Sequence, residues 1–102
     1  MSKESLKEVL ASSEFVIVTA GAAWCGYCTK FKPIFEEVAQ EHGKQYTFTR
    51  VDIVEEVEFP KQYNINGFPT TLFWKDGVEI AREVGYMTKE AFTASIAKHF
   101  KK

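Results

Sequence analysis

The sequence predicts an α/β fold, in which a mixed β-sheet is flanked by helices on both of its faces. Early in the chain, apolar runs that fit buried strands alternate with amphipathic segments of helical period. Near its C-terminal end, Asp76-Gly77 separates two further strand-like runs and predicts an antiparallel hairpin. The 102 residues fit one domain, residues 1–102, and 45% of them are hydrophobic, which is enough apolar surface for a single core.

The N-terminal segment predicts a short helix followed by a buried strand. Ser2 is placed to cap a helix over Lys3–Ser12, where apolar residues recur on one helical face. The run Phe15–Thr19 is apolar and rich in β-branched residues, which favours a strand at the centre of a sheet. Residues 20–23 are then expected to turn the chain.

The middle of the chain predicts a long helix, a strand and a helical connection. Apolar residues at helical spacing indicate a helix over Cys25–Glu41, and Pro33 predicts a kink inside it, because proline lacks the backbone N–H. Tyr46–Asp52 alternates as a strand does, and the acidic segment Val54–Tyr63 is expected to be helical.

The C-terminal third predicts a hairpin and a last helix. Thr70–Trp74 and Val78–Val84 are the strands on either side of the predicted turn. Thr88 is a candidate cap for a helix that ends near Phe100 and buries one apolar face. The predicted order is therefore α-β-α-β-α-β-β-α.

Charge and the N-terminal sequence bear on partners and location. Thirteen Lys and Arg face fourteen Asp and Glu, for a net charge of −1, so we expect no binding to nucleic acid or to anionic lipid. No long apolar run predicts a membrane span, and charged residues stand where a signal peptide would be apolar. We therefore expect a cytoplasmic, soluble protein, although a mature secreted chain given a new Met1 would look the same.

Cys25 and Cys28 are the two cysteines of the chain, and only Gly26 and Tyr27 separate them. Cys25 follows a predicted strand and opens a predicted helix, where unpaired backbone N–H groups favour its thiolate. Cys28 lies one turn later, where more protein covers it. Residues at this spacing in a helix have Cα atoms about 5–6 Å apart, within the range of an ordinary disulfide. We therefore expect Cys25 to be a nucleophile and Cys28 to be its resolving thiol.

Two other interpretations of this pair compete with redox chemistry. A zinc site needs about four ligands, and His42 and His99 are the only histidines, both expected to be solvated at helix ends. No metal and no cofactor are therefore expected. A structural disulfide usually closes a long loop, and a pair this close restrains the unfolded chain very little. Redox chemistry is the interpretation that the spacing favours most.

Several motifs together give the chain a family resemblance. Trp24-Cys25-Gly26-Tyr27-Cys28 follows an apolar strand, Pro33 comes five residues later, and Gly67-Phe68-Pro69-Thr70 and Val84-Gly85 lie further along the chain. In this combination the sequence, from about Phe15 onward, resembles the thioredoxin family. The resemblance implies a thioredoxin fold and reversible thiol–disulfide exchange with protein substrates.

The resemblance also implies how substrates dock. Pro69 matches the cis-proline that faces the active-site cysteines in this family, and the backbone of Phe68 would pair with an extended substrate segment. An apolar rim around Cys25 would then form from six residues: Trp24, Tyr27, Phe68, Gly85, Tyr86 and Met87. Gly26, between the cysteines, is also expected to contact the substrate. By contrast, Phe31, Phe35, Phe73 and Trp74 are expected in the core.

Three features depart from the family pattern. Thr19 stands where the family usually has a buried Asp, and Arg50 matches a basic neighbour of that Asp; both are expected to tune Cys28, and Arg50 either pairs with an acidic residue such as Asp52 or assists the thiol directly. The dipeptide Gly26-Tyr27 replaces the commoner Gly-Pro, which leaves the redox potential open. Because only eighteen residues precede Thr19, the family's first edge strand is expected to be absent, leaving four strands.

Three functions follow, in order of preference. The first is a monomeric disulfide reductase that acts on protein disulfides and is itself reduced by a separate upstream reductase. The second is a disulfide isomerase or oxidase of an oxidising compartment. The third is an interaction module that binds partners irrespective of redox state, which would not need both thiols.

Overall fold

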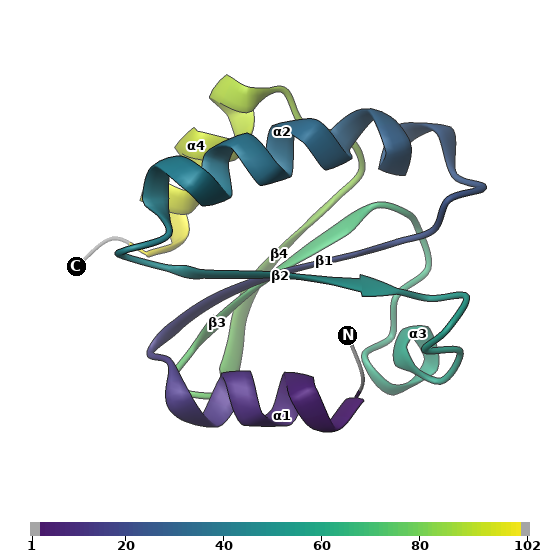
Figure 1. Ribbon diagram of the computed structural model, residues 1–102, viewed down its shortest axis with the longest axis horizontal. Helices are drawn as coiled ribbons and strands as arrows, with labels where there is room; N and C mark the ends of the chain where they lie inside the picture. Colours follow the sequence, from purple (N-terminus) through teal and green to yellow (C-terminus); the bar gives the residue numbers. More distant parts are fainter. Residues whose placement is uncertain (1–2, 101–102) are drawn as a thin grey trace.

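A four-stranded mixed β-sheet forms the centre of the protein (Figure 1). The computed structural model describes the backbone of residues 3–100 and the side chains of residues 8–100, so the predicted Ser2 cap lies outside the described residues. The predicted order of elements is confirmed. The elements are α1 (Lys3–Ser12), β1 (Phe15–Gly21), α2 (Gly26–His42), β2 (Thr47–Asp52), α3 (Phe59–Gln62), β3 (Thr70–Lys75), β4 (Val78–Val84) and α4 (Lys89–His99).

The strands lie in the order β2-β1-β3-β4. β1 pairs in parallel with β2 and antiparallel with β3, and β3 pairs antiparallel with β4. β1 is central, and its residues 16–20 are all buried, as its apolar sequence predicted. Within the described residues, β2 and β4 are the edges of the sheet.

β1 is longer than predicted. Ala20 and Gly21 were expected to turn the chain, but Gly21 pairs with Asp52 of β2, and its carbonyl accepts a hydrogen bond of 3.0 Å from the Ile53 backbone N–H. The parallel ladder therefore holds the chain extended for two more residues. This extension brings the end of β1 directly beneath the first turn of α2.

The connection 54–63 is only partly helical, so the predicted helix is wrong in its extent. The Asp52 side chain accepts a hydrogen bond of 2.9 Å from Val54 N–H. The backbone carbonyl of Asp52 accepts two more, from the backbone N–H groups of Glu55 and Glu56. These local bonds form turns in place of a helix. The helical turn begins only at Phe59, with Pro60 in its first turn.

The hairpin turn agrees with its sequence signal. Asp76 and Gly77 have φ angles of 51° and 81°, and two positive φ angles in succession are what a two-residue hairpin turn requires. The turn joins β3 to β4, whose register shifts between Phe73 and Trp74.

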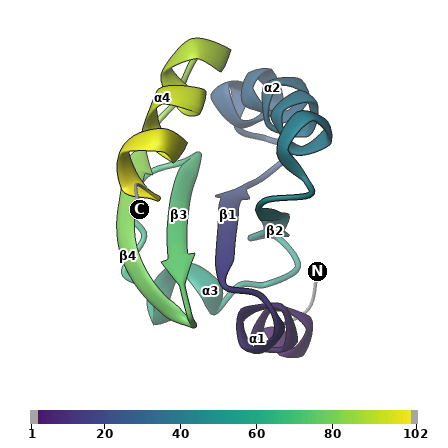
Figure 2. The ribbon, with the colours of Figure 1, turned by 90° about the vertical axis from the view of Figure 1, so that its left-hand side faces the viewer.

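Helices cover both faces of the sheet, as predicted: α2 and α4 lie on one side, and α1 and α3 on the other (Figure 2). On the α2 and α4 side the core is largely aromatic. Its buried members are Ile17, Phe31, Phe35, Val38, Phe73, Phe92, Ile96 and Phe100. On the other side the buried core consists of Val16, Val18, Ala20, Val51, Phe59, Ile65, Leu72 and Trp74. The four residues expected in the core are therefore confirmed there.

Two predictions concern the longest helices: a cap at Thr88 for α4 and a kink at Pro33 for α2. The predicted Thr88 cap is confirmed, because its hydroxyl accepts a hydrogen bond of 3.2 Å from Ala91 N–H. α2 continues through Pro33 as one helix, and the kink stays a prediction. Between residues 3 and 100, no helix combines the length and apolar character needed to cross a membrane.

His99 is not the solvated residue that its place at a helix end suggested. Its side chain is only 15% exposed, its Nε2 lies 2.8 Å from Glu83 Oε2, and its ring packs on Phe73. The partners come from β3 and β4, which the local sequence around His99 does not reveal.

Candidate active site

Cys25 caps the N-terminus of α2. Its backbone is extended, with φ −91° and ψ 115°, and its own N–H donates to the Ala22 carbonyl at 3.1 Å. The Cys25 sulfur accepts a hydrogen bond of 3.2 Å from the Cys28 backbone N–H. The sulfur thus takes the place of the oxygen of a usual capping side chain, at the positive end of a helix of 17 residues. This position favours negative charge on Cys25.

Both cysteines are free thiols in this structure. The Cys25 thiol donates to the carbonyl of Phe68, with a sulfur-to-oxygen distance of 3.7 Å. Burial, followed by the side-chain hydrogen bond with Cys25, raises the pKa of Cys28 to about 11; backbone hydrogen bonds from Ala22 and Cys28 oppose that rise. Cys28 is therefore a neutral thiol near pH 7.

The loop before β3 lies against the cysteines. The Phe68–Pro69 peptide bond is cis, and Pro69 is fully buried. The Pro69 carbonyl accepts a hydrogen bond of 2.7 Å from Gly85 N–H, which ties this loop to the end of β4. The backbone of Phe68, Pro69 and Gly85 thus forms one connected edge beside Cys25.

Aromatic side chains surround this edge. Trp24 and Tyr27 are 66% and 63% exposed, and the Trp24 ring meets Phe68 edge-on at 6.1 Å. The ring centroids of Tyr27 and Tyr86 are 6.2 Å apart. Gly26 is exposed between the cysteines. Of the six expected rim residues, Trp24 thus contacts Phe68, Gly85 is hydrogen-bonded to Pro69, and Tyr27 contacts the fifth, Tyr86, which also packs partly buried against the aromatic core cluster.

Met87 is the sixth, and it turns toward the core. It packs partly buried against the aromatic core cluster, where its sulfur accepts a hydrogen bond of 3.7 Å from the Ser95 hydroxyl. The structure therefore gives Met87 a packing role on the α4 side.

Comparisons with known proteins agree with this geometry. The thioredoxin family model matches residues 1–98. The chain is 38% identical over 88 residues to a thioredoxin of Mycoplasmoides gallisepticum, covering 86% of this chain and 87% of the relative. It is 40% identical over 87 residues to a thioredoxin of Acidithiobacillus ferridurans, covering 85% of this chain and 81% of the relative. The chain belongs to the thioredoxin family.

Solved structures show the same fold. Oxidised thioredoxin from Plasmodium falciparum superposes with a TM-score of 0.84 at 29% identity, over 95% of this chain and 91% of that chain. A mutant thioredoxin from Halobacterium salinarum gives a TM-score of 0.89 at 22% identity, over 100% of this chain and 88% of that chain. The protein is thus a thiol–disulfide oxidoreductase of thioredoxin fold.

Thr19 and Arg50 are the two residues that were expected to tune Cys28. They are neighbours in the parallel pairing of β1 and β2, so both side chains lie on the α2 side of the sheet. Thr19 is 7% exposed, and its hydroxyl has no hydrogen-bond partner among the described residues. Arg50 forms no ion pair within the described part of the chain, so the expected pairing with Asp52 or a glutamate is not found there.

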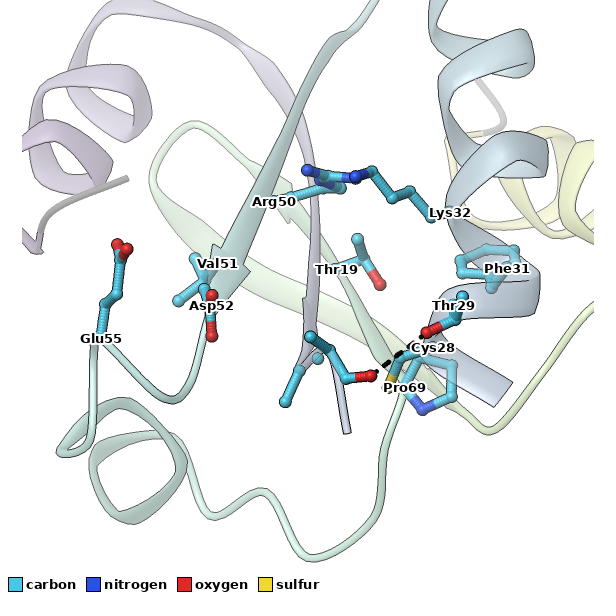
Figure 3. A pocket seen from close by; sticks show the side chains of 13 residues that line it. Thr19, Cys28, Thr29, Phe31, Lys32, Arg50, Val51, Asp52, Glu55 and Pro69 are labelled. Carbon is cyan, nitrogen blue, oxygen red and sulfur yellow. Dashed lines mark hydrogen bonds between the residues drawn. The ribbon is translucent and has the colours of Figure 1, made fainter. Parts of the chain in front are cut away.

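A cavity of about 600 Å³ opens behind Cys28 (Figure 3). Thr19, Cys28 and Pro69 are among the residues that line it, and the exposed residues Lys32 of α2 and Arg50 of β2 line it on the side of Thr19 away from Cys28. The sequence did not predict this cavity, because its walls come from β1, α2, β2 and the loop before β3. Gly21 is the one local sign, since a glycine at the end of a buried strand indicates a close approach.

Proposed function

We propose that the chain reduces protein disulfides, with Cys25 as the nucleophile and Cys28 as the resolving thiol. The observation that carries this proposal is the unequal environment of the two sulfurs. Cys25 caps α2 and accepts the Cys28 N–H, whereas burial holds Cys28 neutral. A thiolate is the attacking form, so attack begins at Cys25.

The reaction proceeds through a mixed disulfide. The Cys25 thiolate attacks one sulfur of the substrate disulfide, a Cys25–substrate bond forms, and the other substrate sulfur leaves as a thiolate. Cys28 then loses its proton and attacks Cys25, which releases the second substrate thiolate and leaves a Cys25–Cys28 disulfide. Two electrons pass to the substrate, and an upstream disulfide reductase returns two electrons to the cysteine pair.

An extended segment of the substrate docks on the Phe68–Pro69 edge. Backbone pairing at such an edge tolerates many sequences, and the exposed rings of Trp24 and Tyr27 add apolar contact beside the attacked disulfide. The chain works as a monomer, because this one domain carries both cysteines and the docking edge. Electron flow toward substrates fits the reducing cytoplasm.

A second function, disulfide isomerase or oxidase, is favoured by one feature: Gly26-Tyr27 between the cysteines in place of the commoner Gly-Pro. The equilibrium potential of the Cys25–Cys28 couple against glutathione separates the two. A potential near the value of about −270 mV that is typical of thioredoxins supports the reductase, and one near or above about −180 mV supports the alternative.

Two serine variants test the roles of the cysteines. We expect Cys25→Ser to abolish reduction of insulin disulfides, and Cys28→Ser to accumulate substrates as mixed disulfides that dithiothreitol releases. Mass spectrometry of the adducts after mixing with oxidised substrate is the measurement. Trapping by Cys25→Ser instead would reverse the assignment, and a Cys25→Ser protein with full activity would contradict the proposed reaction.

A further inference from the structure

The docking edge continues into a group of side chains on the α4 side of the sheet. Gly85, whose N–H donates to the Pro69 carbonyl at 2.7 Å, is followed directly by Tyr86. The centroid of the Tyr86 ring lies 6.2 Å from that of Tyr27 and 6.4 Å from that of Phe31, both on α2. A substrate segment that pairs with the edge therefore meets side chains from the first turns of α2.

Lys30 is held over this group of rings. Its Nζ lies 4.8 Å from the centroid of the Tyr86 ring, a distance at which the face of the ring attracts a cation. This contact restricts a long flexible side chain, so less conformational entropy is lost when the ammonium binds a partner. Lys30 is exposed, and an ammonium has three N–H donors, so donors remain for a ligand.

The charge of Lys30 is not compensated within the described residues. Glu37 and Glu41 follow it on the same face of α2, about two and three turns further along. Lys89 of α4, the helix beside α2 in Figure 2, binds both of these carboxylates at 2.7 Å. Lys30 itself forms no ion pair with any residue between 8 and 100, and the first turn of α2 has no acidic residue. A docked segment therefore meets a positive charge here.

We propose that Tyr27, Lys30 and Tyr86 form a specificity site for acidic substrates, in which a Glu or Asp near the attacked cysteine pairs with the Lys30 ammonium. This inference rests on the proposed function and names the substrate class of the same site. The exposed ring of Tyr27 packs on the apolar part of the substrate segment. Lys30 already occupies the face of Tyr86, so a substrate Lys or Arg finds no free ring there and is repelled.

The helix sets where the acidic residue must stand. Lys30 follows Cys25 by five residues, so its backbone lies about 7–8 Å further along the axis of α2. An extended chain spans about 3.3 Å per residue, so this distance equals about two residues of substrate. We therefore expect the acidic side chain two or three positions from the cysteine that Cys25 attacks.

Peptide disulfides with one variable residue test the proposal. Each peptide has a central cysteine in a mixed disulfide with a pyridylthio group, and Glu, Gln or Lys stands two or three positions before or after that cysteine. The Cys25 thiolate attacks the peptide sulfur and releases thiopyridone, whose absorbance gives the second-order rate constant. Rates of the same peptides with mercaptoethanol correct for the intrinsic reactivity of each disulfide.

The expected preference is that of one exposed ion pair. At low ionic strength we expect a Glu peptide to react about three- to fivefold faster than its Gln counterpart in at least one of these positions. The Lys peptide of the same position should react more slowly than the Gln peptide by a similar factor.

Variants assign the preference to Lys30. Lys30→Gln should bring the ratio of Glu to Gln rates to about one, and Lys30→Glu should reverse it, so that the Lys peptide reacts fastest. Lys32→Gln is the matched control, because it removes the same charge from an exposed lysine of the same helix and should keep the ratio. Tyr86→Leu should lower the ratio, because the ammonium loses the ring beneath it, whereas Tyr86→Phe retains a ring and should keep it.

Equal corrected rates for Glu and Gln peptides at every position would overturn the proposal, as would a ratio that survives Lys30→Gln. An equal fall of the ratio in Lys32→Gln would also overturn it, since the preference would then come from the overall charge of α2. A protein that releases no thiopyridone from any peptide, or that releases it as fast after Cys25→Ser, would instead contradict the proposed function.

Discussion

Gly21 leaves no room for a side chain. A Cβ built at this position would lie 2.8 Å from the Cys28 sulfur and 3.1 Å from the Cys28 Cβ. The Cys28 side chain is too short to bend away from this clash, so an added methyl group must displace its sulfur or the first turn of α2. Gly21 therefore sets the position from which Cys28 attacks.

We expect Gly21→Ala to slow resolution of the mixed disulfide by about tenfold or more, since a displacement of about 1 Å at a reacting group can cost about 10²-fold. Overpacking should also lower the free energy of unfolding by about 1–3 kcal/mol. Rapid mixing of the reduced protein with a symmetrical aromatic disulfide measures the rates, because one reporter thiolate is released when Cys25 attacks (the first phase) and another when Cys28 resolves (the second phase). Urea unfolding measures the stability. No atom of Cys25 lies within 4 Å of a Cβ at Gly21, so the first phase, the attack by Cys25, should hardly change.

Gly26→Ala is the matched control. No atom lies within 4 Å of a Cβ at Gly26, and its backbone is helical, so the added methyl group should leave stability unchanged or raised by up to about 1 kcal/mol. Equal losses of stability in the two variants would show that the contact with Cys28 does not matter.

At the scale of single residues, sequence reasoning found those whose chemistry is fixed by local spacing. Cys25 and Cys28 could be predicted because a strand-to-helix junction places them, and Trp24 and Tyr27 because they adjoin the pair. The unpaired Thr19 hydroxyl and the half-buried His99 ring could not, since their surroundings come from other strands and helices.

At the scale of elements, the β3–β4 turn depends on Gly77. Its φ of 81° lies in the left-handed region, and a Cβ there would meet only the Leu10 carbonyl, at an ordinary 3.8 Å. The cost of Gly77→Ala is therefore conformational rather than steric. We expect the free energy of unfolding to fall by about 1–2 kcal/mol with the cysteine chemistry unchanged.

Thermal or urea unfolding and the reporter reaction check this expectation. Asp76→Asn is the control, because asparagine also favours positive φ and should leave stability nearly unchanged. A Gly77→Ala protein as stable as the parent would mean that the turn adopts another conformation at no cost.

The same scale shows which elements the sequence predicts well. The hairpin was predicted because Asp76 and Gly77 specify their own backbone conformation. The helix over 54–63 was predicted too long, because the hydrogen bonds of Asp52 form local turns that compete with it. An acidic segment without a strong apolar period carries no signal that decides between the two outcomes.

At the scale of the whole molecule, the sheet divides the core into two layers, and the redox pair lies where β1 passes into α2. β1 supplies Ile17 to one layer and Val16 and Val18 to the other, so its register fixes both. Cys28 lies against the end of β1, and its pKa is raised in the folded protein. Its protonation is therefore linked to the stability of the whole fold.

This linkage predicts that the reduced protein loses stability as the pH rises from about 9 to about 11. The ordinary thiol pKa of 9.0 applies to the unfolded chain, and burial raises the pKa of Cys28 in the folded protein to about 11. In this window the unfolded chain has released the Cys28 proton and the folded chain keeps it, so unfolding releases a proton and higher pH favours it. We expect a loss of at most about 2 kcal/mol in the free energy of unfolding.

Urea unfolding at pH 8, 9, 10 and 11 with excess reductant measures this loss, and Cys28→Ser isolates it. The variant keeps the other alkaline titrations, including Tyr63, whose pKa burial and then Glu79 raise, but it lacks the thiol. Its stability should therefore fall less steeply over the same pH range, and the difference between the two curves should grow from pH 9 to pH 11. The oxidised protein, which has no Cys28 proton to lose, should lack this component as well. Curves that stay parallel from pH 8 to pH 11 would mean that folding does not raise the pKa of Cys28, and would contradict this prediction.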